Sequence, residues 1–459
     1  MPIQRPSIFV QIASYRDPEC QWTVKDLFAK AEHPERVTVG ICWQSFPEQD
    51  QNCFVEPSPW PEQTKIISVL PSESLGVCWA RAKTQTLFED QDYILMIDSH
   101  MRFVSGWDTA LIAELARCSS PKSFLSTYPP SYKPPDQLEL SPLPVVMRAQ
   151  PFTALGDIRF EGETLALKPE RPLRGAFLAG GFIFAPGSFV REIPYDPHIY
   201  FDHEEITIAA RAYTHGWDVF SPPGIFVYHY YYEPKKGETR SLHWSDNRDW
   251  GRLQQVSRAR YNYLLAGIIP EEYPEALVDI EKYDLGTART IDAFEEFTGI
   301  DFKGKTVSAR ATTSQFIEGI DRYRRQTDVI TPLKAGDVMP SFRICDAEGV
   351  WRDTQTFAGK SCFLCALPSN FDAYTVEFME LYRKHRAEFQ TAGFRLVFIP
   401  AAGDETRDFY RALKIEGRVH DTPFTYLLDA RRKIIGFYDN RNALNHISDL
   451  LRAARNGVQ

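Results

Sequence analysis

The first hundred residues alternate extended apolar runs with amphipathic segments of helical period. The extended runs occupy 7–14, 36–43, 64–71 and 92–99, and the helical patterns occupy 22–31 and 75–89. Strands that alternate with helices are typical of βα units, which build a mostly parallel sheet with helices on both faces. The sequence therefore predicts an α/β fold, an architecture that often binds nucleotides but does not by itself prove binding.

The pattern is interrupted once and then resumes. Residues 126–144 contain closely spaced prolines that permit neither a central strand nor a long helix, so we expect a surface loop beside the site. A strand-like run follows within 173–189, then a helical segment at 203–216 and a closing apolar run at 217–234. Residues from about 241 to 325 are helical and polar in pattern, which predicts an extension of the first domain.

With 459 residues the chain exceeds the roughly 250–300 at which single cores stop growing, so we expect two domains. The first spans residues 1–325, a linker spans 326–334, and the second spans 335–459. The second has its own alternation, with a strand near Cys362, a helix from about Tyr374 to Phe389 and a further helix near Asp408. Strands are also expected at 394–401, 425–430 and 433–438. About 120 residues suffice for an independent fold.

Composition excludes several classes of protein. The formal charge of −9, without a long Lys/Arg run, argues against a nucleic-acid binder, and an acidic protein that binds phosphate groups must recruit a cation. The first residues lack the pattern of a secretory signal, and no apolar run approaches the ~20 residues that span a bilayer. Eight scattered cysteines do not make a disulfide framework, so a cytoplasmic location is expected.

The strongest local signal is Asp98-Ser99-His100 at the end of an apolar strand. Positions i and i+2 of an extended chain point to the same side, so one carboxylate and one imidazole can face one ion. Ligands of open α/β sheets bind just beyond the carboxyl ends of strands. Mn²⁺ or a similar divalent ion suits this pair, although a chance tripeptide with a capping Asp is the alternative.

His229, between two tyrosines at the end of the last apolar run, is a candidate for a third ligand. A packed, hydrogen-bonded histidine in the core is the alternative.

Five acidic or glycine positions are candidates for contact with a substrate. Asp202, Glu204 and Glu205 open a helix, where carboxylates commonly favour the helix dipole, but one of them can also face a bound substrate. Upstream, Gly180 and Gly181 allow a ligand to approach the backbone closely, with a bulge or a tight packing point as the alternative.

The residues after the first strand, Ser14-Tyr15-Arg16-Asp17, lie where a nucleotide base is expected in such a sheet. Arg81, in a helical segment, is a candidate to counter a phosphate or to pair with Asp17. For these residues, simple surface pairing is the alternative.

Taken together, seven blocks in order resemble one family, the cytoplasmic polypeptide N-acetylglucosaminyltransferases best known for modifying hydroxyproline. The blocks lie at 11–20, 39–44, 78–82, 97–103, 106–108, 202–205 and 214–220. The resemblance covers about residues 5 to 310. It departs from the family pattern at Met96, where a Gln is expected, and at Val77, where a Pro is usual.

The resemblance implies a GT-A fold, UDP-GlcNAc as donor, a divalent metal, and transfer with retention to a hydroxyl of a protein or peptide. The D-S-H element is also similar to that of the polypeptide GalNAc-transferases, which implies Asp98, His100 and His229 as Mn²⁺ ligands. Asp98, Ser99, Arg81 and both glycines would then contact the donor. Glu204 or Glu205 would orient the sugar, and an inverting enzyme would instead use one of the carboxylates as a base.

Residues 334–342, 359–368 and 421–429 look like a thioredoxin-fold domain of the peroxiredoxin type, with Pro423 as its cis-proline. Asp372 and Thr375 stand where the family places its catalytic Thr and Cys, so no peroxidase nucleophile is expected. Cys362 and Cys365 lie three apart in one strand-like run and would point to opposite faces, which disfavours a disulfide. We expect a binding or acceptor-docking module.

Two other functions remain open at this point. The same catalytic domain can act on a small molecule or a glycan. Alternatively, the whole chain is a non-catalytic scaffold whose thioredoxin-like module is the functional part.

Overall fold

A computed structural model describes residues 6–54, 57–232 and 241–324 continuously. Beyond these it describes residues 338, 343–345, 351–353, 362–366, 373–391, 395–399, 424–428, 431, 434–438, 447 and 450–453. Contacts within the chain divide it into two compact units, Met1–Arg325 and Gln326–Gln459. The expected linker 326–334 lies outside the described residues.

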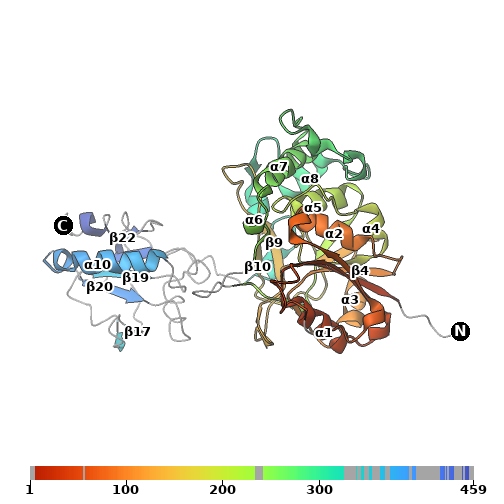
Figure 1. Ribbon diagram of the computed structural model, residues 1–459. Helices are drawn as coiled ribbons and strands as arrows, with labels where there is room; N and C mark the ends of the chain where they lie inside the picture. Colours follow the sequence, from red (N-terminus) through yellow and green to blue (C-terminus); the bar gives the residue numbers. More distant parts are fainter. Residues whose placement is uncertain are drawn as a thin grey trace. The chain divides into compact units, whose positions relative to one another are not determined.

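The first unit is built on an eight-stranded mixed sheet (Figure 1). In sheet order its strands are β11 (Leu173–Arg174), β13 (Asp218–Ser221), β6 (Ser123–Ser126), β12 (Phe182–Pro186), β4 (Tyr93–Asp98), β1 (Ile8–Tyr15), β2 (Val37–Gln44) and β3 (Thr64–Val69). β4, β1, β2 and β3 are parallel to one another, and so are β13 and β6, whereas β12 runs antiparallel to both of its neighbours. β11 is antiparallel to β13, so six of the eight strands run in one direction and the sheet is mostly parallel, as predicted.

Helices cover both faces of this sheet because its strands are apolar on both sides. In β4, Ile94 and Met96 belong to one hydrophobic core, whereas Leu95 and Ile97 belong to the other. The first core is covered by α2 (Val77–Gln85), α4 (Ser188–Glu192), α5 (Glu204–Thr214), α7 (Trp250–Ala266), α8 (Ile291–Thr298) and α9 (Ala309–Thr312). The second is covered by α1 (Cys20–Lys30) and α3 (Trp107–Leu115). The predicted α/β class is confirmed.

Short strand pairs extend the first unit beyond the main sheet. They are β5 (Met101–Phe103) with β14 (Val227–His229), β7 (Tyr132–Lys133) with β8 (Gln137–Leu138), β9 (Val145–Ala149) with β10 (Phe160–Thr164), and β15 (Ile300–Asp301) with β16 (Thr306–Val307). The proline-rich segment, expected as a loop, thus contains the small β7–β8 hairpin. Within 241–324, α6 (His243–Asp246) and α7 to α9 form the expected helical region, and Tyr261 and Phe294 join the first core.

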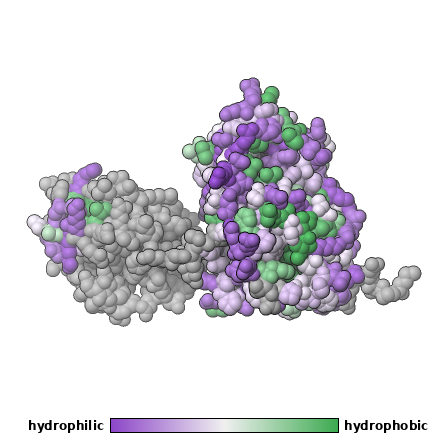
Figure 2. All heavy atoms as spheres, viewed as in Figure 1, coloured by the Kyte–Doolittle hydropathy of each residue, from purple (hydrophilic) through white to green (hydrophobic). Residues whose placement is uncertain are grey.

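The surface of the first unit is mixed. Figure 2 shows one face, on which hydrophilic residues predominate and hydrophobic residues gather in small groups between them. Among the described residues, no helix is long and apolar enough to cross a membrane.

The second unit contains a four-stranded sheet in the order β20 (Arg395–Ile399), β19 (Cys362–Ala366), β21 (Phe424–Leu428), β22 (Ile434–Tyr438). β19 and β20 are parallel, and β21 is antiparallel to both β19 and β22, which is the core arrangement of the thioredoxin fold. α10 (Ala373–Thr391) packs Phe389 against Phe363 with ring centroids 5.8 Å apart. A separate pair joins β17 (Arg343–Cys345) to β18 (Trp351–Asp353).

The cysteines of the second unit lie as predicted along the chain. Cys362 and Cys365 both fall in β19, and the Cys362 side chain is buried. Pro423, Asp372 and the segment around Asp408 lie outside the described residues.

Candidate active site

The site begins where β4 and β1 end. Asp98 is the last residue of β4 and pairs in register with Ala13 of β1, so the residues that follow both strands reach the same edge of the sheet. This is the edge at which open α/β sheets bind ligands.

Three predicted metal ligands meet at this edge. Asp98, His100 and His229 each offer a ligand atom, and these atoms lie within 4.8 Å of one another. His229 arrives from β14, which pairs with β5 so that His229 is opposite Met101. Its Nε2 lies 3.2 Å from Asp98 Oδ2, and its backbone N–H donates to the carbonyl of Pro130 in the proline-rich segment. Asp98 and His229 lie 131 positions apart in the sequence, and the pairing of β14 with β5 brings them together.

Asp17 holds the His100 ring of this cluster in place. One Asp17 carboxylate oxygen is 2.6 Å from His100 Nδ1 and also accepts a hydrogen bond from the Ser99 hydroxyl at 2.6 Å. A carboxylate on Nδ1 fixes the ring orientation and leaves Nε2 to face a ligand, as is common behind metal-binding histidines. Asp17 and Ser99 thus orient His100, and their contact with the donor stays a prediction.

Arg81 is a buried bridge between two carboxylates. Its guanidinium donates to Asp98 Oδ1 at 2.8 Å and to Glu204, and it lies 3.1 Å from the Tyr195 hydroxyl. The expected pairing of Arg81 with Asp17 is wrong, because Asp17 is held by His100 instead. Burial alone would raise the pKa of Asp98, but the hydrogen bond from His229 and the charge of Arg81 outweigh it and hold that pKa well below its usual range.

Replacing Arg81 by leucine is expected to destabilise the first unit by about 3–5 kcal/mol, because it leaves a buried carboxylate without its counter-charge. Chemical denaturation of the variant and the wild type measures the difference in free energy of unfolding. Arg191→Leu is a matched control, since Arg191 pairs with Asp90 at the exposed surface and such pairs contribute about 0–1 kcal/mol. Equal losses in the two variants would contradict the bridging role.

The two glycines lie against this bridge. A Cβ on Gly181 would overlap the Asp98 carboxylate, and one on Gly180 would lie 2.8 Å from an Arg81 nitrogen and from Glu204. Their lack of a side chain therefore lets β12 approach the acidic cluster, in addition to leaving room for a ligand.

Glu205 and its neighbour Glu204 accept hydrogen bonds from different groups. Its carboxylate accepts hydrogen bonds from the Gly180 N–H at 2.9 Å and from the Tyr128 hydroxyl at 3.0 Å. Burial raises the pKa of Glu205 to about 7, and the nearby charge of Glu204 adds to this, against the lowering effect of the Gly180 hydrogen bond. Glu204, by contrast, is held by Arg81 and by Tyr195, whose hydroxyl donates at 2.7 Å. Glu205 is therefore the carboxyl group that can change protonation near neutral pH.

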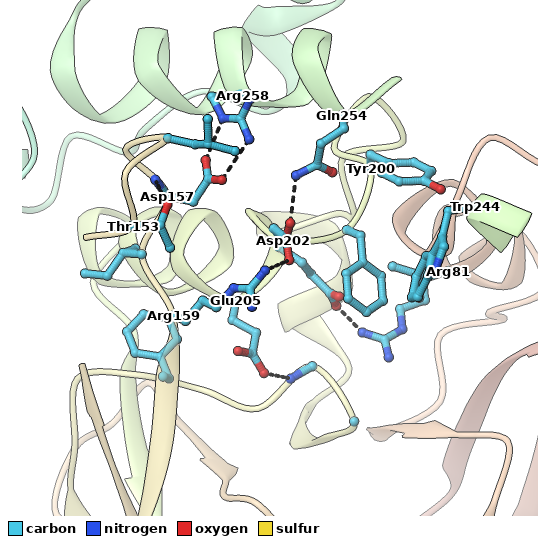
Figure 3. A pocket seen from close by; sticks show the side chains of 18 of the residues that line it. Arg81, Thr153, Asp157, Arg159, Tyr200, Asp202, Glu205, Trp244, Gln254 and Arg258 are labelled. Carbon is cyan, nitrogen blue, oxygen red and sulfur yellow. Dashed lines mark hydrogen bonds and ion pairs between the residues drawn. The ribbon is translucent and has the colours of Figure 1, made fainter. Parts of the chain in front are cut away.

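A cavity of about 900 Å³ opens beside these residues. Asp98, Gly180, Gly181, Glu204 and Glu205 line one part of it. The other lining residues come from several segments: Val77, Arg81, Tyr128, Thr153, Leu155, Asp157, Ile158, Arg159, Phe160, Tyr200, Phe201, Asp202, Trp244, Trp250, Gln254 and Arg258. Figure 3 shows Asp202 on this wall, joined to Gln254 and Arg159.

The residues expected at a nucleotide base lie at the end of β1, next to α6. Tyr15 and Arg16 both contact Asp246 of α6, at 2.9 and 2.8 Å, and Arg16 also pairs with Asp50. Ser14 is buried, and its carbonyl accepts a hydrogen bond from Gln44. These side chains close the end of β1 against α6 and do not line the cavity.

Sequence reasoning missed most of the cavity wall. Asp157 pairs with Arg258 at 2.7 and 2.8 Å and with His203 at 2.8 Å, although the three residues come from segments far apart. Neither a motif nor a period marks Asp157, Gln254 or Arg258. The one available signal was the aromatic pair Tyr200-Phe201 directly before the acidic cluster.

Among solved structures, GalNAc-T7 with UDP, GalNAc and Mn²⁺ is similar at 13% identity and a TM-score of 0.42, over 64% of this chain and 56% of that chain. Two thioredoxin-like structures are also similar: DsbE from Chlorobium tepidum (17% identity, TM-score 0.20, 26% of this chain and 96% of that one) and peroxidoxin BcpB from Mycobacterium tuberculosis (15%, 0.23, 28% and 99%).

No protein with a curated function matches the chain in sequence. The model of one family, described as glycosyltransferase (GlcNAc), matches residues 7–67 and 58–304, which together span more than half of the 459 residues. The chain therefore belongs to the GlcNAc glycosyltransferase family.

Proposed function

We propose that the protein transfers a sugar, GlcNAc in the first instance, from a UDP-sugar to a hydroxyl group of a protein or peptide, with a divalent metal and with retention of configuration. The observation that carries this proposal is the convergence of Asp98, His100 and His229 on one point beside the cavity. The family description supports GlcNAc as the sugar.

The residues present fit a divalent ion such as Mn²⁺. One carboxylate and two imidazoles would hold the ion, and diphosphate oxygens would complete its coordination. The Asp17 hydrogen bond leaves Nε2 of His100 as the ligand atom. When bound, the ion would supply the positive charge that stabilises the departing diphosphate, which an acidic chain of net charge −9 otherwise lacks.

The protein's own residues then position the reactants. Arg81 holds one oxygen of Asp98 and leaves the other directed at His229 and the ion site. Glu205, held by Gly180 and Tyr128, orients hydroxyl groups of the donor sugar. In the mechanism that we propose, the acceptor hydroxyl attacks the anomeric carbon from the face that the diphosphate leaves, and its proton passes to the diphosphate. No general base in the protein is then needed.

A screen for slow donor hydrolysis tests the proposal. The full-length protein with Mn²⁺ is incubated separately with UDP-GlcNAc, UDP-GalNAc, UDP-Glc and UDP-Gal, and released UDP is measured with and without EDTA. Release from UDP-GlcNAc that EDTA abolishes is expected. No release from any donor, together with no binding of UDP in calorimetry, would exclude a glycosyltransferase and favour a non-catalytic scaffold.

A further inference from the structure

Three large aromatic side chains stand exposed at the mouth of the cavity. Phe201, Trp244 and Trp250 keep 47%, 40% and 44% of their surface exposed, and all three line the cavity. They come from the loop before α5, from α6 and from the start of α7, and the rings of Phe201 and Trp244 meet edge to face at 5.5 Å. Exposed aromatic residues gathered at one place indicate a binding site, because such surface is unfavourable in water.

The same cavity contains the proposed transfer site. Its wall runs from Asp98, Gly180 and Glu205 to Trp244 and Trp250 without leaving the first unit. In Figure 3, Trp244 and Tyr200 lie on the side of Arg81, and Asp202 lies between them and Glu205. A molecule that rests on the aromatic rings can therefore present a hydroxyl group toward the donor sugar.

The polar groups of the wall favour a peptide over a glycan as that molecule. The Asp202 carboxylate already accepts from Gln254 at 2.8 Å and from Arg159 at 3.4 Å, and Asp157 is held by Arg258 and His203. A glycan acceptor is bound through many hydrogen bonds along its length, and the two carboxylates on this part of the wall already accept hydrogen bonds from neighbouring side chains. Aromatic surface flanked by paired polar groups suits an apolar side chain of a peptide.

α6 fixes Trp244 in place through its neighbours. His243 Nδ1 lies 2.7 Å from the Tyr200 hydroxyl and its Nε2 lies 3.0 Å from the Ser74 carbonyl, while Asp246 binds Tyr15 and Arg16. A ring that is held before binding loses little conformational entropy when an acceptor arrives. The aromatic surface is thus preorganised beside the end of β1.

We infer that Phe201, Trp244 and Trp250 form the acceptor subsite, and that it takes an extended peptide with an apolar side chain next to the hydroxyl-bearing residue. This inference rests on the proposed function, since it names the acceptor of the same transfer.

The test uses nonapeptides with a central Ser, Thr, Tyr or 4-hydroxyproline, flanked by either Leu or Asp. Transfer from the active UDP-sugar is measured by mass spectrometry for the wild type, Trp244→Ala and Trp250→Ala. We expect Leu-flanked peptides to be preferred, and kcat/KM to fall about 10- to 100-fold in each variant, mainly through KM. Trp244→Phe should recover most of the loss, which separates a binding role from a folding defect.

Trp22→Ala is the matched control. Trp22 is similarly exposed, at 37%, but lies on α1 beside Lys25 and does not line the cavity, so its kcat/KM should stay within about twofold of the wild type.

Three results would overturn the inference while leaving the proposed function intact. They are UDP release without modification of any peptide, peptide transfer that neither Trp variant changes, and transfer to a panel of oligosaccharides that depends on the two tryptophans. A wild-type protein that releases no UDP from any donor contradicts the proposed function instead, so the two failures are distinguishable.

Discussion

Asp98→Asn is expected to lower metal-dependent UDP release by on the order of a thousandfold. The substitution keeps the shape of the side chain but removes its negative charge. Of the three proposed ligands, Asp98 is the carboxylate and the other two are histidines. Loss of the ion removes several kcal/mol of charge stabilisation from the departing diphosphate, and each 1.36 kcal/mol corresponds to about tenfold in rate.

The measurement is the rate of UDP release at saturating donor over a range of Mn²⁺ concentrations, with Mn²⁺ affinity determined separately by calorimetry. Asp90→Asn provides the control, because Asp90 is an exposed aspartate that pairs with Arg191 at the surface. Wild-type Mn²⁺ affinity in Asp98→Asn would show that the ion binds elsewhere.

Glu205→Gln is expected to lower the rate of sugar transfer about 100-fold above pH 7 and to remove a pH dependence from it. The wild-type rate should rise as the pH increases through about 7, the pKa to which burial raises Glu205, because the ionised carboxylate is the stronger acceptor for sugar hydroxyls. Glutamine has the same shape but cannot ionise, so the variant should show a flat profile in this range.

The same shift has a consequence for stability. Between about pH 4.5 and 7, Glu205 stays protonated in the folded state, whereas it is ionised in the unfolded chain. The free energy of unfolding therefore falls as the pH rises over this range, and this contribution is lost once the pH has passed about 7. Relative to the wild type, Glu205→Gln should thus be more stable at pH 8 than at pH 5.

Glu295→Gln is the control, since Glu295 also accepts a backbone N–H, from Phe302, and also has a raised pKa, but lies on α8 away from the cavity. An unchanged rate profile in Glu205→Gln would remove Glu205 from the reaction.

The parts of the site that sequence could predict are those fixed by local rules. Asp98 is the last residue of an apolar strand and His100 follows two positions later, so both lie at its carboxyl end. The alternation of strands and helices likewise predicted a sheet covered on both faces, because each strand of such a sheet must be apolar on both sides.

The rest of the site depends on packing between distant segments. Pairing with Asp17 was one alternative for Arg81, but the fold brings Arg81 of α2 to Glu204 and Asp98 instead. Its contact with a phosphate stays a prediction. Trp244 follows a polar stretch, and only the contacts of α6 with Tyr15, Tyr200 and Ser74 bring it to the cavity. Such contacts leave no periodic pattern in the sequence.

The most direct test of the account is a crystal structure with Mn²⁺ and UDP, in which anomalous scattering locates the ion. The account predicts one strong peak within about 2.0–2.3 Å of an Asp98 oxygen and of one nitrogen each from His100 and His229, with diphosphate oxygens in the open positions. A peak bound by other residues, or UDP bound with no ion beside its diphosphate, would contradict it.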